Sequence, residues 1–546
     1  MRPRLVVRRR PALATASRPL PPPSCRRSLA TVNSIKARPV LPFLLVPRAS
    51  PSVARSFTSE RRQWLKHEAK LVVRYTLTFW GILAAVAAIS FAIHEEVGER
   101  DFPTPHEWHY LTRKFLRDAH RRKDPKDGDV NWAMALDLAR TALLRLEDGG
   151  SDGARLTKLS DREVPALEVP GEFIHYDISA NSEEWRRGYF DAIMLAAKAA
   201  EHVDGWVRDR TRNVVSPPEF VIGPSNPRPA PIPPGNPHAP REEDCDPAYP
   251  SADNWYMKIL ATKGFMSRQM MEAALEYASF VEFKGRADGA EALYSLALAE
   301  ATKGSEPSTL PFDPKTLVLK HGVEPASMNI LDALTASANF KARRGDVSSA
   351  LPMYISLLKT RRSLADIPPP EASSKPRRRS LYQQVTNFFA PPPYPAPPVD
   401  GSRPPWRSPY ERCQEASLHL YIGEIMYANS SHADGLAWTR DGVDLAEEQL
   451  RALSKTEKGA KQTCRECLAT GLDNWSTMVA RLARAEEAKG KSGSKSAIFS
   501  LWSGPKDAEG RWAAEEAVVQ ERMRRTAELM EDIVPPETGL LSYFKA

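Results

Sequence analysis

A run of 19 uncharged residues, 75–93, constrains the fold of this 546-residue chain more than any other feature. The run reads YTLTFWGILAAVAAISFAI and has no polar face when it is wound as a helix. At 1.5 Å per residue it reaches roughly 28 Å, close to the hydrocarbon thickness of a bilayer. Long soluble helices usually keep a polar face. The run therefore predicts a transmembrane helix over residues 75–93.

The charges that flank this run predict its orientation. The basic segment 58–74 precedes it, and acidic residues follow it at positions 95, 96, 99 and 101. The positive-inside rule keeps the basic flank on the inner side of the membrane. In the mitochondrial inner membrane, the N-terminus would then lie in the matrix and the C-terminal domain in the intermembrane space.

Residues 1–57 have the composition of a mitochondrial presequence, because they are rich in Arg, Ser, Ala and Pro and lack acidic residues. Arg55, Phe57 and Thr58 resemble the cleavage site of the matrix processing peptidase. A disordered basic tail without an import role is the alternative.

The chain's net charge of +8 arises in its first 74 residues, since these hold 17 Lys and Arg against two acidic residues. The remainder is mildly acidic, so nucleic acid is not an expected partner.

Small residues recur at four-residue spacing within the apolar run. Such a stripe allows helix backbones to approach closely, which favours packing against another transmembrane helix. Tolerated membrane alanines are the alternative. The candidate packing residues are Gly81, Ala84, Ala85, Ala88 and Ala92.

The region after the apolar run reads as helix, with few strand patterns. Thr104 suits an N-cap, Pro105 the first helical position and Glu107 the third, which together predict a helix over 105–122. Apolar residues at helical spacing predict further helices over 131–147 and 183–208. Residues 101–215 are therefore expected to form helical hairpins, and the fold class is all-α.

Residues 273–298 and 333–358 repeat one pattern at an offset of 60 residues. Each window predicts a helix, a turn with glycine and a second helix. The spacing of small residue, glycine, alanine and aromatic residue is similar to that of tetratricopeptide (TPR) repeats. In that pattern the small residues let paired helices touch, and the aromatic residue fills the gap toward the next unit. The residues concerned are Ala278, Gly285, Ala290, Tyr294, Ala338, Gly345, Ala350 and Tyr354.

The predicted architecture is one transmembrane helix followed by an interrupted TPR-like α-solenoid. Residues 253–365 hold the TPR-like repeats, and residues 410–546 hold C-terminal TPR-like helices. Two proline-rich stretches interrupt the array: an insertion over 216–250 and a linker over 366–409. Such composition favours extended, solvated backbone.

No motif of a catalytic, cofactor-binding or metal site survives inspection, so the chain is not predicted to be an enzyme and needs no cofactor. His106 and His109 are one residue too close for a zinc-binding HExxH helix. Cys464 and Cys467 lie in a helix predicted over 463–489, without a second pair. Burial as small apolar residues is expected for them, and a redox or disulfide role in the intermembrane space is the alternative.

Binding in a groove is then the expected activity. In TPR units the first helix of each pair lines the concave face. Thr335 stands where a chaperone-binding clamp needs lysine, so the mixed acidic and apolar lining favours extended, partly apolar polypeptide instead. By this register the candidate groove residues are Glu272, Leu275, Ser279, Glu282, Phe283, Asp332, Thr335, Asn339, Ala342 and Arg343.

The order of these segments resembles that of the fungal TPR-containing adaptor subunit of the mitochondrial inner-membrane i-AAA protease supercomplex. The strings that carry the resemblance lie at residues 102–108, 421–450 and 464–482. The resemblance implies a non-enzymatic adaptor that binds unfolded or damaged proteins and delivers them to the i-AAA protease, with the protease and its co-adaptor as partners. A scaffold for assembly of another inner-membrane complex and an outer-membrane import receptor are the alternatives.

Overall fold

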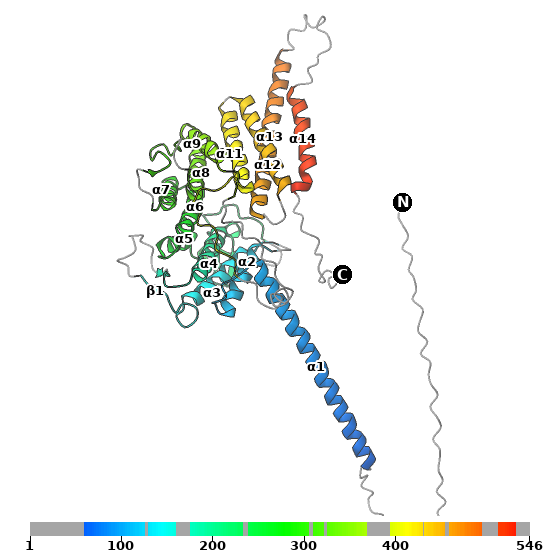
Figure 1. Cartoon of the computed structure of the whole chain (residues 1–546). Coiled ribbons are helices and arrows are strands. Elements are labelled where there is room, and N and C mark those ends of the chain that lie inside the picture. The colour runs from blue at the N-terminus through cyan, green and yellow to red at the C-terminus, as the bar shows by residue number, and fades with distance from the viewer. Residues whose placement is uncertain are drawn as a thin grey trace, which may run out of the picture. The chain divides into compact units, whose positions relative to one another are not determined.

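The structure is a computed structural model (Figure 1), and it describes residues 59–125, 129–159, 175–232, 238–304, 309–320, 325–368, 394–429, 431–453, 458–493 and 511–530. The expected cleavage residues Arg55, Phe57 and Thr58 lie outside these ranges. Thirteen α-helices and five short strands occur within the described residues, so the prediction of a mainly helical chain is confirmed. The chain divides into two compact units, residues 1–87 and 88–546.

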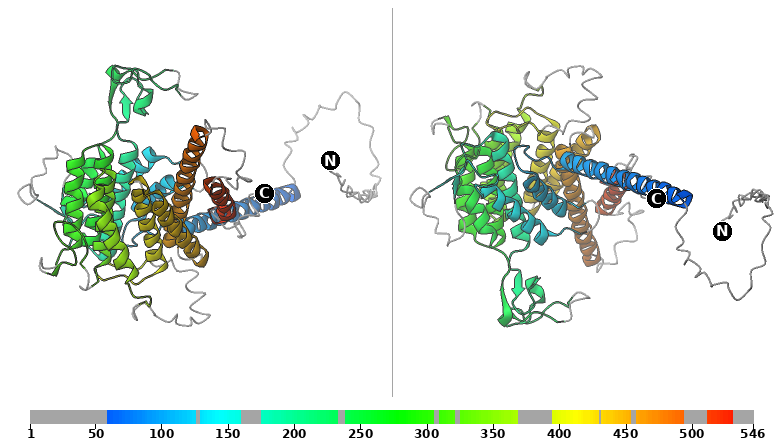
Figure 2. Two further views of the ribbon diagram at one scale, coloured as in Figure 1. Left: turned by 90° about the horizontal axis from the view of Figure 1, so that it is seen from above. Right: turned by 90° about the horizontal axis from the view of Figure 1, so that it is seen from below.

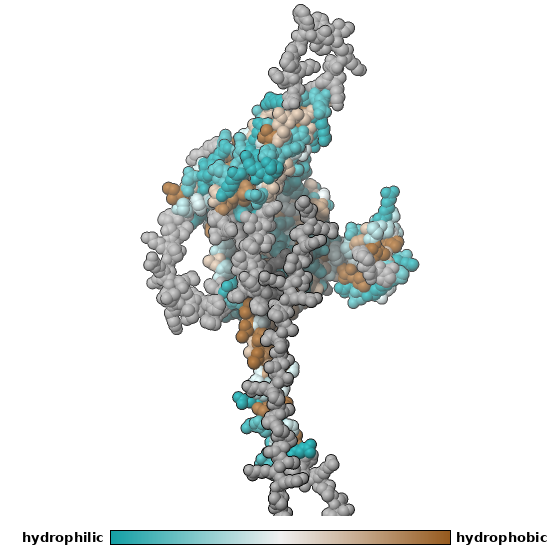
Figure 3. All heavy atoms as spheres, turned by 90° about the vertical axis from the view of Figure 1, so that its right-hand side faces the viewer, coloured by the Kyte–Doolittle hydropathy of each residue, from teal (hydrophilic) through white to brown (hydrophobic). Residues whose placement is uncertain are grey.

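Helix α1 (Ser59–Asp101) contains the whole predicted apolar run and extends beyond it at both ends. The side chains of residues 75–93 are exposed in the structure, and the helix is long and apolar enough to cross a membrane. Figure 3 shows apolar side chains along this helix in brown. The five small residues of the stripe are exposed, and no other side chain approaches Gly81 within 4 Å.

The second unit is built from helices that pack on their neighbours in sequence. Pairs form between α2 and α3, α6 and α7, α8 and α9, α11 and α12, and α13 and α14. Contacts also join α2 to α4, α4 to α6, α6 to α8 and α11 to α13; we call these six the first helices. The bounds are α2 (Tyr110–Lys123), α3 (Trp132–Glu147), α4 (Glu183–His202), α5 (Ala252–Ala261), α6 (Ser267–Phe283), α7 (Ala287–Ala301), α8 (Met328–Arg343), α9 (Val347–Arg362), α11 (Pro409–Ala428), α12 (His432–Ala452), α13 (Lys458–Gly493) and α14 (Arg511–Met530).

The two repeat windows have the same turn. Gly285 follows α6 with φ 75°, and Gly345 follows α8 with φ 84°. Each glycine N–H donates to a carbonyl three residues back, and the next residue donates five residues back. Left-handed backbone of this kind favours glycine because a side chain would be strained there. The alanines of both windows, Ala278, Ala290, Ala338 and Ala350, are fully buried.

The repeat tyrosines connect each helical pair to the next. Tyr294 of α7 packs against Phe340 of α8, with ring centroids 4.9 Å apart. Tyr354 of α9 packs in the same way against Tyr421 of α11, at 5.4 Å. Both tyrosines are buried, so each ring fills the space between successive pairs.

Two glycines let α11 and α12 approach closely. A Cβ at Gly423 would lie 2.9 Å from the carbonyl oxygen of Gly435, and a Cβ at Gly435 would lie 2.5 Å from the backbone nitrogen of Tyr427. Because these neighbours are backbone atoms, they cannot yield by changing rotamer.

We expect Gly435→Ala to separate α11 from α12 and to lower the free energy of unfolding by roughly 1–3 kcal/mol, the usual cost of overpacking. Thermal unfolding in detergent micelles, followed by tryptophan fluorescence, measures the change. Gly459→Ala in α13 is the matched control, since a Cβ there would meet no other part of the chain within 4 Å. Equal midpoints for the two variants would contradict the close contact.

The proline-rich stretch 216–250 is not the fully solvated insertion that its composition predicts. It contributes to an antiparallel sheet in the order β4-β3-β5, formed by β3 (Val207–Asp209), β4 (Val214–Ser216) and β5 (Cys245–Pro247). Proline carbonyls still accept hydrogen bonds, and that of Pro240 accepts from Ile222 at 2.9 Å. The sheet also ends the predicted helix 183–208 early, at His202. Figure 2 shows these strands as a small lobe beside the helices.

Helices α11 and α13 are joined by a disulfide between Cys413 and Cys464. The expectation that Cys464 is simply a buried small residue is therefore wrong, whereas Cys467 is a buried free thiol. Burial raises the pKa of Cys467 to about 12, which keeps this thiol protonated and unreactive at neutral pH.

Cys413→Ser should lower the stability of the C-terminal helices, because the bond closes a loop with a sequence separation of 51. The chain-entropy model gives roughly 4 kcal/mol for such a loop. Thermal unfolding with and without dithiothreitol tests this: the reductant should lower the midpoint of the wild type but not that of the variant. Cys245→Ser, which removes a free cysteine, should behave as the wild type.

Candidate functional site

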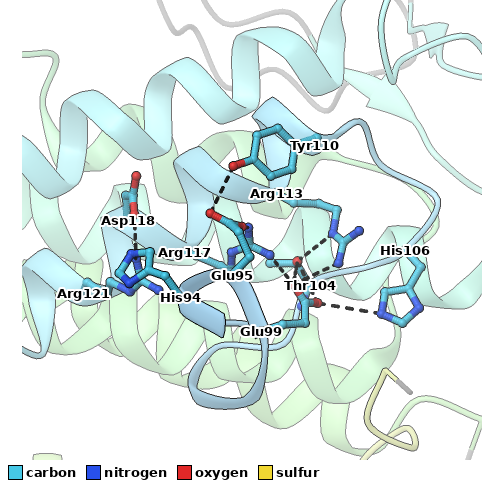
Figure 4. Close-up of polar contacts among 10 residues, drawn as sticks. All are labelled: His94, Glu95, Glu99, Thr104, His106, Tyr110, Arg113, Arg117, Asp118 and Arg121. Carbon is cyan, nitrogen blue, oxygen red and sulfur yellow. Dashed lines mark hydrogen bonds and ion pairs between the residues drawn. The ribbon is translucent and has the colours of Figure 1, made fainter. Parts of the chain in front are cut away.

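The C-terminal end of α1 is held to α2 by a cluster of ion pairs, which we call the α1–α2 cluster. It consists of Glu95, Glu99, Thr104, Arg113 and Arg117. Figure 4 shows the two glutamates of α1 turned toward the two arginines of α2. Both pairs of residues are four apart, so each pair lies on one face of its helix.

Glu99 is the centre of the cluster and is buried. Its carboxylate accepts hydrogen bonds from the Thr104 backbone N–H at 2.9 Å and from the Thr104 hydroxyl at 3.1 Å. Arg113 lies 2.9 Å from the same carboxylate, and Arg117 bridges Glu99 and Glu95. Burial by itself raises the pKa of Glu99, but the Thr104 N–H and the two guanidinium charges outweigh it, and the pKa is lowered.

This arrangement overturns the predicted capping box. Thr104 bonds to Glu99 and does not cap a helix, and α2 begins at Tyr110 with His109 as its N-cap residue. Pro105 instead packs on α4, because a Cβ at Gly188 would lie 2.5 Å from Pro105 and 2.7 Å from Trp108. Thr104, Pro105 and Trp108 are buried, so residues 102–108 connect α1 to α2 through side chains that pack against α4.

A distant carboxylate takes the role expected of Thr104. Asp152 accepts from the backbone N–H of His109 at 2.9 Å and from the hydroxyl of Thr112 at 2.6 Å. The start of α2 is thus fixed by a residue 43 positions later in the chain.

Most polar side chains of the predicted groove bond to other residues of the chain. Glu282 of α6 pairs with Arg343 of α8 at 2.7 Å and accepts from the Tyr294 hydroxyl at 3.0 Å. The hydrogen bond from Arg343 is the main reason that the pKa of Glu282 is lowered. Asn339 accepts from the Tyr354 hydroxyl at 2.8 Å. The structure therefore brings these residues together but leaves few of their polar atoms for a ligand.

The other members of the predicted groove divide between interior and surface. Thr335 bonds to a carbonyl of its own helix, and Leu275 packs on the core. Ser279 and Phe283 of α6 are exposed; the Ser279 side chain hydrogen-bonds to that of Tyr294, and Phe283 is 88% exposed. Glu272 and Asp332 share Arg268, at 3.0 and 3.5 Å.

Within the part of the chain that the structure describes, no three His, Cys, Asp or Glu side chains are placed to hold a metal ion. Every carboxylate of the α1–α2 cluster faces an arginine, so the cluster holds the end of α1 to α2 and offers no unpaired carboxylate. Neither the protein-family models nor the curated proteins compared with this chain match it.

Sequence reasoning missed the α1–α2 cluster, although a signal for it exists. Acidic residues at 95 and 99 and basic residues at 113 and 117 have the same four-residue spacing on consecutive helices. Opposite charges at matched spacing pair when the two helices fold back on each other. The misplaced helix start at Pro105 concealed this match.

Replacing Glu99 by glutamine should destabilise the α1–α2 cluster by roughly 1–3 kcal/mol, because buried Arg117 then keeps only Glu95 as its charged partner. Glu99→Gln and the matched control Glu96→Gln are compared by thermal unfolding in detergent. Glu96 pairs with Arg100 at the surface, so its loss should cost less than about 1 kcal/mol.

The lowered pKa of Glu99 predicts that the stability difference between the wild type and Glu99→Gln depends on pH. Because the folded pKa of Glu99 is lowered, its contribution is complete above the pKa of the unfolded carboxyl and is lost as pH falls through the folded pKa. The stability gap between wild type and Glu99→Gln should hold above about pH 5 and close in more acidic solution. A gap that widens on acidification would contradict the ion pairing.

Proposed function

We propose that the chain is a non-enzymatic adaptor, anchored by α1 in the mitochondrial inner membrane, that binds unfolded or damaged polypeptides and delivers them to the i-AAA protease. Its helical pairs would form a TPR-like array in the intermembrane space, with the N-terminus in the matrix. The protease and its co-adaptor are the proposed partners. The ion-paired contact between the C-terminal end of α1 and α2 is the observation that carries the proposal.

This contact supports tethering for a physical reason. Ion pairs join the end of α1 to α2, and the buried residues Pro105 and Trp108 pack against α4. A ligand held by the helical pairs would be kept within a limited volume beside the membrane. Its effective concentration at a neighbouring protease would then exceed its concentration in solution.

The helical pairs support a TPR-like array through recurring contacts. Both repeat windows have a left-handed glycine turn, fully buried alanines and a tyrosine packed on the next pair. The first helices touch one another from α2 through α8, as stacked repeats require.

Two further features suit an intermembrane-space polypeptide binder. A disulfide between Cys413 and Cys464 fits an oxidising compartment better than a reducing one. The exposed ring of Phe283 offers an apolar contact on a first helix. Extended, partly apolar chain is the ligand that such a contact suits.

Affinity purification of the tagged chain from digitonin-solubilised mitochondria should recover the i-AAA protease, and protease treatment should digest residues 102–546 in mitoplasts but not in intact mitochondria. A tagged, unrelated single-span inner-membrane protein is the control. Recovery of a different assembly, with normal turnover of protease substrates, would favour the scaffold. Digestion in intact mitochondria would favour the outer-membrane receptor.

A further inference from the structure

The described end of the second proline-rich stretch is held against the first helices. Residues 394–403, which we call the strap, have no helix or strand but make contacts at both ends. At one end the Arg187 guanidinium of α4 lies 4.4 Å from the Tyr394 ring centroid and donates to the Pro395 carbonyl at 2.6 Å. The predicted linker is therefore bound across a first helix rather than solvated throughout.

The other end of the strap lies on α8. The Asn329 side chain donates to the Asp400 carbonyl at 3.0 Å, and the Asn329 backbone N–H donates to the Gly401 carbonyl at 3.1 Å. The backbone N–H of Met328 donates to the Arg403 carbonyl at 3.2 Å. The strap thus satisfies the first amides of α8, which have no partner within their own helix.

We call the contacts of the strap with α4 and with α8 its first and second anchors. Glycine is required at the second anchor. Gly401 is buried and has φ 74°, and a Cβ there would lie 2.1 Å from Asn329 Oδ1 and 2.7 Å from Arg268 Nη1. Between the anchors, residues 396–400 are exposed. The six residue-to-residue steps from Pro395 to Gly401 reach roughly 20 Å when extended, at about 3.3 Å per step.

The hydrogen bonds that α4 and α8 donate to the strap all go to backbone carbonyls. Helix α4 also makes the cation–π contact with the Tyr394 ring. Contacts of this kind recognise extended polypeptide with little regard for most side chains. The same surface would accept another chain that carries an aromatic residue and, seven positions later, a glycine. The strap is then one ligand among several that fit.

We propose that the N-terminal ends of α4 and α8 form a binding surface for extended polypeptide, and that the strap occupies this surface as a displaceable internal ligand. Arg187 selects an aromatic residue, and Asn329 selects a glycine seven positions later. The inference rests on the proposed function for the kind of ligand, and it names where that ligand binds. Polypeptide binding then requires release of the strap.

The test measures binding of a fluorescein-labelled peptide with the sequence of residues 394–405, YPAPPVDGSRPP, to the purified full chain in detergent micelles. The double variant Tyr394→Ala/Gly401→Ala weakens the cation–π contact of the strap with Arg187 and its hydrogen bonds with Asn329. The strap then no longer competes with the peptide, so the variant should bind the peptide about tenfold more tightly than the wild type. Adding Arg187→Ala or Asn329→Ala should return binding to the level of the wild type. A peptide with Tyr394→Ala and Gly401→Leu is the matched control and should bind neither protein.

Hydrogen exchange separates strap release from unfolding. The amides of Met328 and Asn329 should exchange faster in the double variant, while the rest of α8 keeps its protection. If the double variant loses that protection, Tyr394→Ala alone decides, because it leaves the Gly401 anchor intact and should still tighten peptide binding. Equal binding by wild type and released chain, or no binding by a folded released chain, overturns the proposal. The protease takes no part in this experiment, so its outcome is independent of the co-purification result.

Discussion

Glu99 is a buried carboxylate at the end of an apolar helix, and its need for partners organises the residues that follow. A buried charge is tolerated only when it is paired and hydrogen-bonded, and Glu99 obtains its partners from Thr104, Arg113 and Arg117. These bonds hold α2 against the end of α1, while Asp152 fixes the start of α2. The connection between α1 and α2 packs Pro105 against Gly188 of α4. The helical pairs therefore begin from a position set by electrostatics rather than by apolar packing alone.

Periodic features of the sequence predicted the helical architecture well. The apolar run lies within α1, and the amphipathic stretch 131–147 matches α3, whose N-cap Asn131 accepts from Met134. The repeat glycines occupy left-handed turns, which only a residue without a side chain adopts readily. These features depend on residues within about one or two turns of each other, which is the range that a local pattern reports.

Features that depend on distant partners were not predictable in this way. The residues that follow Thr104 have the pattern expected after an N-cap, but the Thr104 hydroxyl donates a hydrogen bond to Glu99 instead. The partner of Cys464 is Cys413, outside the local CxxC pair. In the candidate groove, Glu282 and Arg343 occupy nearly equivalent positions of adjacent repeats, 61 residues apart. Stacking brings such positions together, so opposite charges there pair with each other and not with a ligand.

The contact between Arg187 and Pro395 spans 208 residues, the longest separation among the hydrogen bonds described. Closing a loop of that length carries an entropic cost that a single bond cannot offset. Residues 394–403 can therefore settle only after α4 and α8 have been brought together by the helices between them. During synthesis and folding, this part of the chain would be among the last to find its place, and under mild denaturation it would be among the first to leave it.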